Sequence, residues 1–190
     1  MPRVCVLLAN GFEEIEAVTI VDVLRRAEID VTTLGVDGVD VEGSHGIRIQ
    51  ADRELSESTA DEGWDMVVLP GGMPGAATLR DDPRVQAFVR SQHEKRRKIA
   101  AICAAPIALG RAGILWGRRA TSYPGFEDQL TGASIVAERV VQDGAVTTSR
   151  GPGTAMEFAL TLAADLKGDD EASSVAGRML FEIPRTHGAF

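Results

Sequence analysis

Cysteine and histidine are scarce in this chain. Among its 190 residues are two cysteines, at positions 5 and 103, and three histidines, at positions 45, 93 and 187. The cysteines form neither a CxxC pair nor a metal set, and the histidines lie too far apart in the sequence to suggest one. We therefore expect a reduced thiol protein of the cytoplasm, with no metal site and no cofactor.

Long apolar runs are also missing, and basic residues cluster at only one place in the sequence. No stretch approaches the ~18 apolar residues of a membrane span, and the N-terminus shows no apolar stretch followed by a cleavage site. The net charge is -8, whereas nucleic-acid binding relies on clustered Lys and Arg. The single basic run, Lys95-Arg96-Arg97-Lys98, suits the negative end of a helix. Neither a membrane nor a nucleic acid is expected as a partner.

Apolar residues are abundant, at 44% of the chain, and their spacing predicts an α/β protein. Continuous apolar runs indicate strands buried on both faces, and helical spacing follows them, as at positions 15, 18, 20, 21 and 24. Alternating strands and helices predict a doubly wound or related three-layer sandwich. We expect one domain over residues 1–183 and a tail over 184–190. The predicted strands cover residues 4–9, 30–36, 65–69 and 98–103, and the predicted helices cover residues 14–27, 83–95, 154–167 and 170–180.

Two hairpins and one helix start are predicted from local signals. Residues 39–42 alternate and pair with 46–50, and Asp143-Gly144 is a strong turn signal between 136–141 and 145–148. Thr154 and Glu157 have the spacing of a capping box, which predicts that a helix begins there.

Cys103 stands where an apolar strand gives way to a helix. Small neighbours, Ala104 and Ala105, suit a sharp strand-to-helix turn, and Pro106 suits an early helical position. The unpaired N–H groups and positive dipole end of such a helix lower a thiol pKa from its usual ~8.5. Cys103 is therefore a candidate nucleophile. A buried structural cysteine is the alternative that this segment alone leaves open.

Three loops leave the carboxyl ends of the predicted strands, where open α/β sheets bind their ligands. The first loop carries Glu13, Glu14 and Glu16, the second carries Gly71 and Gly72, and the third carries the thiol. Together they offer an acid/base group, N–H donors for an oxyanion and a nucleophile. The alternatives are that the carboxylates simply favour the first turn of a helix and that the glycines form a tight turn.

Four segments of the chain resemble the ThiJ/PfpI superfamily, most closely the branch that contains the Parkinson-disease protein deglycase and its bacterial relatives. They are Gly11-Phe-Glu-Glu-Ile-Glu16, Val-Leu-Pro70-Gly71-Gly72, Ala-Ala-Ile-Cys103-Ala-Ala-Pro and Thr148-Ser-Arg-Gly-Pro-Gly-Thr154. The likeness runs in order from about residue 2 to residue 182. It implies a flavodoxin-like three-layer α/β/α sandwich, related to class I glutamine amidotransferases, and a homodimer.

The resemblance also implies roles for individual residues. Cys103 is the family's reactive cysteine, and Glu16 is the acid beside its sulfur, protonated because a thiolate nearby disfavours a second negative charge. The N–H groups of Gly72 and Ala104 match the family's oxyanion site, next to Gly71. The peptidase-like branch has a histidine directly after the nucleophile, and Ala104 stands there in this chain, which argues against proteolysis.

One position departs from the deglycase pattern. Where the deglycase has a histidine in a short Thr-His-Pro segment, this chain has Ser122-Tyr123-Pro124. A thiol–imidazole pair from that position is absent, and Tyr123 offers a hydroxyl donor instead. His45 falls on the first predicted hairpin. A position near the dimer interface and an exposed surface histidine are the alternatives, and the exposed histidine is the one expected.

The activity implied by the resemblance is glutathione-independent glyoxalase and deglycase chemistry on methylglyoxal, a small reactive carbonyl compound, or on its early adducts. Cys103 attacks the aldehyde and Glu16 transfers protons. The alternatives are a redox sensor in which Cys103 is oxidised without turnover, an isocyanide hydratase-type lyase, and a binding module with little catalysis.

Overall fold

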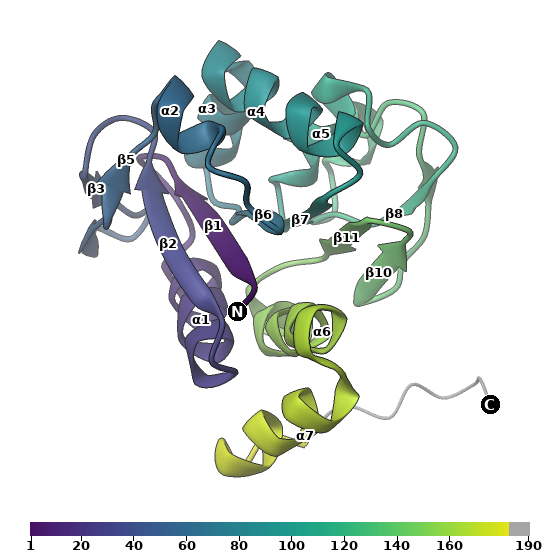
Figure 1. Cartoon of the computed structure of the whole chain (residues 1–190). Helices are drawn as coiled ribbons and strands as arrows, with labels where there is room; N and C mark the ends of the chain where they lie inside the picture. Colours follow the sequence, from purple (N-terminus) through teal and green to yellow (C-terminus); the bar gives the residue numbers. More distant parts are fainter. Residues whose placement is uncertain (183–190) are drawn as a thin grey trace.

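The computed structural model describes residues 1–182, and a seven-stranded sheet forms its centre (Figure 1). The strands pair in parallel except for the antiparallel strand at one edge. Their spatial order is β10 (Val140–Asp143), β11 (Val146–Ser149), β7 (Lys98–Ile102), β6 (Met66–Leu69), β1 (Arg3–Leu8), β2 (Asp30–Gly35) and β5 (Arg53–Glu54).

Helices cover both faces of this sheet and complete three layers (Figure 1). One face carries α1 (Glu14–Arg26), α6 (Ala155–Lys167) and α7 (Asp169–Arg178). The other carries α2 (Glu57–Ala60), α3 (Gly75–Asp81), α4 (Pro83–Glu94) and α5 (Pro106–Ala112). The predicted flavodoxin-like three-layer sandwich is therefore confirmed. None of the helices within residues 1–182 has the length and apolar character that crossing a membrane requires.

The central strands are apolar throughout because helices cover them on both faces. Every residue from Val4 to Leu8 on β1 is at most 1% exposed, and β6 and β7 are buried in the same way apart from Lys98 at the start of β7. Burial on both faces fixes the strands in register, so their carboxyl ends lie along one edge of the sheet. That edge is where the three candidate loops meet.

Two smaller sheets lie beside the central one. The first predicted hairpin is present as β3 (Asp40–Glu42) and β4 (Arg48–Gln50), paired antiparallel. The second is shorter than predicted, since β10 begins only at Val140. Short elements that the sequence did not predict are α2, α3, β5, β8 (Arg119–Ala120), β9 (Ser134–Ile135) and two 3-10 turns, η1 (Glu127–Gln129) and η2 (Pro152–Thr154). The predicted tail over 184–190 lies outside the described residues.

The predicted capping box at the start of α6 is wrong. Thr154 makes no side-chain cap for that helix. Its hydroxyl instead bonds to Ser149 Oγ, 2.7 Å away, and accepts the Gly151 N–H at 3.1 Å, while Glu157 accepts a hydrogen bond from Arg139. Thr154 therefore closes the 3-10 turn η2, which directly precedes α6.

The apolar face of α1 also differs from its prediction. Ile20 and Leu24 are buried as the spacing suggests, but Ile15 and Val18 are 58% and 51% exposed. The helix packs on the molecule through Ala17, Ile20 and Leu24, which follow the i, i+3, i+7 spacing of one helical face. The side chains at 15 and 18 consequently lie on a second apolar surface that this chain alone does not cover.

Candidate active site

Cys103 lies in a sharp turn between β7 and α5. Its backbone is left-handed, with φ +64°, a conformation that costs a non-glycine residue free energy. The turn is held by three backbone hydrogen bonds: Cys103 N–H donates to Ser149 O at 2.9 Å, Tyr123 N–H donates to Cys103 O at 2.8 Å, and Ala105 N–H donates to Ile102 O at 3.0 Å. The predicted strand-to-helix turn is confirmed, and it leaves the cysteine 9% exposed at the edge of the sheet.

Glu16 reaches the same edge from the first turn of α1. Its side chain is fully buried, and Oε2 accepts the Gly71 N–H at 2.7 Å. The other oxygen, Oε1, is buried without a hydrogen-bond partner among residues 1–182. Burial raises the pKa of Glu16 to about 7, against the lowering effects of the Gly71 N–H and of Cys103. The carboxyl group therefore holds a proton far more readily than an exposed glutamate, but the cause is burial and not the thiolate charge on which the prediction was based.

The pKa of Cys103 moves in the opposite direction from the prediction. Burial and, to a smaller extent, the charge of Glu16 raise it to about 12, against the lowering effect of the N–H groups of Ala104 and Gly72. The seven-residue helix α5 does not overcome burial at this position. Because Glu16 disfavours the thiolate only while it is ionised, a proton on Glu16 removes this repulsion and provides a donor for the sulfur. The protonation states of the two groups are therefore coupled.

The glycine pair after β6 brings the second loop against the other two. Gly71 uses its N–H for Glu16, so this group is not free for a substrate. Gly72 has φ +89°, and a Cβ there would lie 2.3 Å from the backbone nitrogen of Glu13. The Glu13 N–H in turn donates to Gly71 O at 2.8 Å. The three predicted loops therefore do meet, with the N–H groups of Gly72 and Ala104 directed at the thiol.

A comparison with known protein families agrees with this geometry. The model of the DJ-1/PfpI family matches residues 2–165. The chain belongs to the DJ-1/PfpI family. The predicted resemblance to the ThiJ/PfpI superfamily is thereby confirmed, and the match spans all three loops of the site.

Relatives in the DJ-1/PfpI family occur in plants and animals. Proteins DJ-1 homolog B and A of Arabidopsis thaliana are each 44% identical over 181 residues, covering 94% and 93% of this chain. The chain spans only 41% and 46% of those two relatives. Parkinson disease protein 7 homolog of Danio rerio is 40% identical, covering 95% of this chain and 97% of the relative. Glutathione-independent glyoxalase DJR-1.2 of Caenorhabditis elegans is 34% identical, covering 86% and 87%.

A solved structure of the family shares the fold closely. The crystal structure of Drosophila melanogaster DJ-1beta superposes with a TM-score of 0.92 at 42% identity, covering 95% of this chain and 98% of that chain. The arrangement of layers and strands described above is therefore that of a DJ-1 protein.

Tyr123 contacts the site through its backbone in this member of the family. Its N–H holds the Cys103 carbonyl, while its side chain is 48% exposed and its ring lies edge-on to Phe126, with centroids 6.5 Å apart. The residue lines an open hollow of about 410 Å³ with Arg139 and Arg150 among its neighbours. The role of its hydroxyl as a donor stays a prediction.

The prediction that His45 is exposed is confirmed, but a partnership with Glu14 was not foreseen. The imidazole is 70% exposed, and its Nδ1 lies 2.9 Å from Glu14 Oε2. Burial raises the pKa of Glu14, yet hydrogen bonds from the side chain and backbone of His45 outweigh it and hold that pKa at about 2. Glu14 therefore fastens the β3–β4 hairpin to α1 and takes no part in the Cys103 pair.

Proposed function

We propose that the protein is a cysteine-dependent, glutathione-independent glyoxalase that also acts as a deglycase on early methylglyoxal adducts. The observation that carries this proposal is the buried pair of Cys103 and Glu16, with two backbone N–H groups aimed at the sulfur. A relative at 34% identity, named as a glutathione-independent glyoxalase, supports it. Both cysteines are free, which fits the reducing cytoplasm as the proposed location.

The reaction begins when the Cys103 sulfur adds to the aldehyde carbon of methylglyoxal and forms a hemithioacetal. Glu16, as a carboxylate, takes the proton from the Cys103 thiol during this addition and passes it to the oxygen that the addition creates. The N–H groups of Gly72 and Ala104 stabilise the negative charge on that oxygen until the proton arrives. The glutamate carboxylate left behind is then the base for the next step. A site that shares one proton between thiol and acid suits this exchange.

The second half of the reaction moves a hydrogen from one carbon to the next. Glu16 removes the proton from the hemithioacetal carbon, giving an enediol, and returns a proton to the neighbouring carbon, giving a lactate thioester on Cys103. Water cleaves the thioester to lactate and the free thiol, so methylglyoxal and one water give one lactate. Deglycation uses the same thiol to take the carbonyl-derived fragment from a damaged amine or thiol.

Turnover is the test of this proposal. We expect the native protein to convert methylglyoxal to lactate many times per chain without glutathione or any added thiol, and Cys103→Ser to form none above the uncatalysed background. Lactate is measured enzymatically for both isomers. Equal lactate from the native protein and Cys103→Ser would reject the glyoxalase. Mass spectrometry showing oxygen added to Cys103 by peroxide would then favour the redox sensor, and consumption of an isocyanide would favour the hydratase-type lyase.

We further propose that the protein is a homodimer formed through the uncovered apolar surface of α1 and the β3–β4 hairpin. Ile15, Val18 and Ile47 are each more than half exposed there. Val18 also lines, with Ile49, a hollow of about 250 Å³ between α1 and β4. Apolar side chains gathered in this way are typical of a protein interface, and a second copy of the chain would cover them.

A charge on this surface should separate the two copies. We expect Val18→Asp to sediment as a monomer where the native protein sediments as a dimer, because a carboxylate at the interface would be desolvated without a partner. Analytical ultracentrifugation measures the difference. Ile135→Asp is the matched control, since Ile135 is also an apolar residue, 44% exposed, and lies on β9, which pairs with β8 in a separate small sheet. A native protein that sediments as a monomer, or a Val18→Asp variant that remains dimeric, would contradict this interface.

A further inference from the structure

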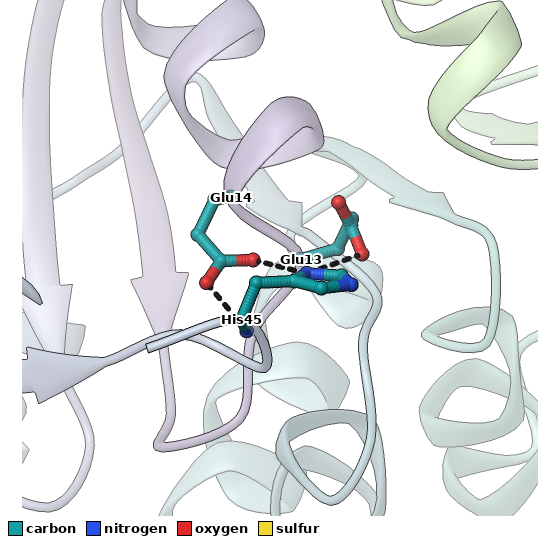
Figure 2. Close-up of side chains that lie close together, drawn as sticks. All are labelled: Glu13, Glu14 and His45. Atoms are coloured by element: carbon teal, nitrogen blue, oxygen red, sulfur yellow. Dashed lines mark hydrogen bonds and ion pairs between the residues drawn. The ribbon is translucent and has the colours of Figure 1, made fainter. Parts of the chain in front are cut away.

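Three side chains with metal-binding atoms lie together where α1 begins. Glu13 precedes this helix, Glu14 is its first residue, and His45 lies in the turn between β3 and β4. One ligand atom from each lies within 4.8 Å of the other two. Figure 2 shows the carboxylates of both glutamates facing the same nitrogen of the imidazole ring. That nitrogen, Nδ1, is 2.9 Å from Glu14 Oε2 and 3.7 Å from Glu13 Oε2.

This group of residues carries more negative charge than its surroundings balance. Glu13 and Glu14 are only 9% and 5% exposed, and no Lys or Arg of residues 1–182 forms an ion pair with either. The carboxylate of Glu13 accepts no hydrogen bond from the described chain and points at His45 (Figure 2). The Glu13 side chain is 11% exposed, and a carboxylate so largely removed from water gains from a nearby cation, because partial burial of an unpaired charge costs free energy. The hairpin supplies hydrogen bonds to Glu14, whereas the one ion-pair partner of Glu13 among residues 1–182 is His45, which is 70% exposed and 3.7 Å away.

We propose that Glu13, Glu14 and His45 bind a divalent cation, with Zn²⁺ as the ion whose chemistry fits best. Zinc takes imidazole nitrogen and carboxylate oxygen at about 2.0–2.2 Å, usually with tetrahedral geometry. Ligand atoms at two corners of such a tetrahedron are about 3.3–3.5 Å apart. The separations of 2.9 and 3.7 Å from Nδ1 lie on either side of this value. Binding displaces the proton from Nδ1, and the neutral ring keeps its proton on Nε2.

The ligands are held ready by the fold. Glu14 Oε1 accepts the backbone N–H of His45 at 2.7 Å, and Ser44 Oγ donates to Oε2 at 3.3 Å. Gly43 closes the hairpin against the glutamate, because a Cβ at that position would lie 2.3 Å from Glu14 Oε1. Hydrogen bonds of this kind orient metal ligands in proteins. A water molecule would supply the fourth ligand of such an ion.

Zinc binding to the full-length reduced chain tests the site directly. We expect isothermal titration to give one Zn²⁺ per chain, with the affinity unchanged in Cys103→Ser. Glu13→Gln and His45→Asn should each weaken binding at least about tenfold. With Co²⁺ as a spectroscopic probe, we expect d–d bands and no sulfur-to-metal charge-transfer band. This readout does not depend on glyoxalase activity, so the metal site and the proposed function fail separately.

Glu13→Gln is the decisive variant. Its carboxylate makes no hydrogen bond with the described residues, so the substitution leaves the hairpin contacts of Glu14 in place, which an unchanged melting temperature would verify. His93→Asn is the matched histidine control on α4 and should bind zinc like the native protein. The proposal is overturned if the chain binds no Zn²⁺, if Glu13→Gln or His45→Asn binds it as tightly as the native chain, or if Cys103→Ser abolishes binding.

Discussion

Replacing Glu16 by glutamine is expected to slow lactate formation by about 10²–10⁴-fold, the usual contribution of a general acid–base group. Glutamine keeps an oxygen for the Gly71 N–H, which Glu16 accepts at 2.7 Å, but it has no proton to transfer. The same change removes the charge that, after burial, raises the pKa of Cys103. A larger fraction of thiolate is then present at neutral pH, so we expect Cys103 to react faster with iodoacetamide.

These two opposite effects distinguish a proton carrier from a residue that merely supports the fold. Lactate formation and the rate of Cys103 alkylation, followed by mass spectrometry, are measured on the same preparation. Glu157→Gln is the control, since this glutamate on α6 has only 12% of its side chain exposed and pairs with Arg139 instead of the thiol. A parallel fall in both rates would indicate a disturbed site. Unchanged lactate formation would remove Glu16 from the mechanism.

The strands at the centre of the sheet were predictable because their apolar pattern depends on burial alone. The runs that became β1, β6 and β7 were placed to within about two residues, the margin by which element ends usually vary. The elements that were missed are short and held by contacts distant in sequence. β5, for example, has two residues, and both pair with β2. No local pattern identifies a segment whose conformation is fixed by its neighbours.

In the candidate site, too, the features that depend on local sequence were predictable and those that depend on distant contacts were not. The turn at Cys103 and the position of Glu16 followed from strand ends and from the resemblance, but the direction of the thiol pKa did not, because burial depends on packing by the whole fold. The contact between Glu14 and His45 joins residues 31 positions apart. Neither the spacing of acids in a first helical turn nor an isolated histidine indicates such a pair. The proposed zinc ligands could therefore be found only in three dimensions.

Replacing Gly71 by alanine is expected to damage both stability and activity. The added Cβ would lie 2.6 Å from the Cβ of Cys103, 2.8 Å from Glu16 Oε2 and 2.9 Å from the carbonyl oxygen of Ile102. The Ile102 oxygen is a backbone atom, and the Cys103 Cβ is bonded directly to the backbone. Because the sheet holds this backbone in place, neither atom can move without moving β7 or the turn after it. Overpacking of this kind costs about 1–3 kcal/mol. For a chain of this length, each kcal/mol lowers the melting temperature by about 2–4 °C.

Gly153→Ala is the control that separates this contact from a general effect of adding a methyl group, because a Cβ at position 153 meets no atom within 4 Å. Thermal unfolding and lactate formation are measured for both variants. We expect Gly153→Ala to match the native protein and Gly71→Ala to fall in both, since the methyl group separates Glu16 from the thiol that it serves. A Gly71→Ala variant with native stability and full turnover would show that Cys103 and Glu16 need not be in contact, which would contradict the shared proton on which the mechanism depends.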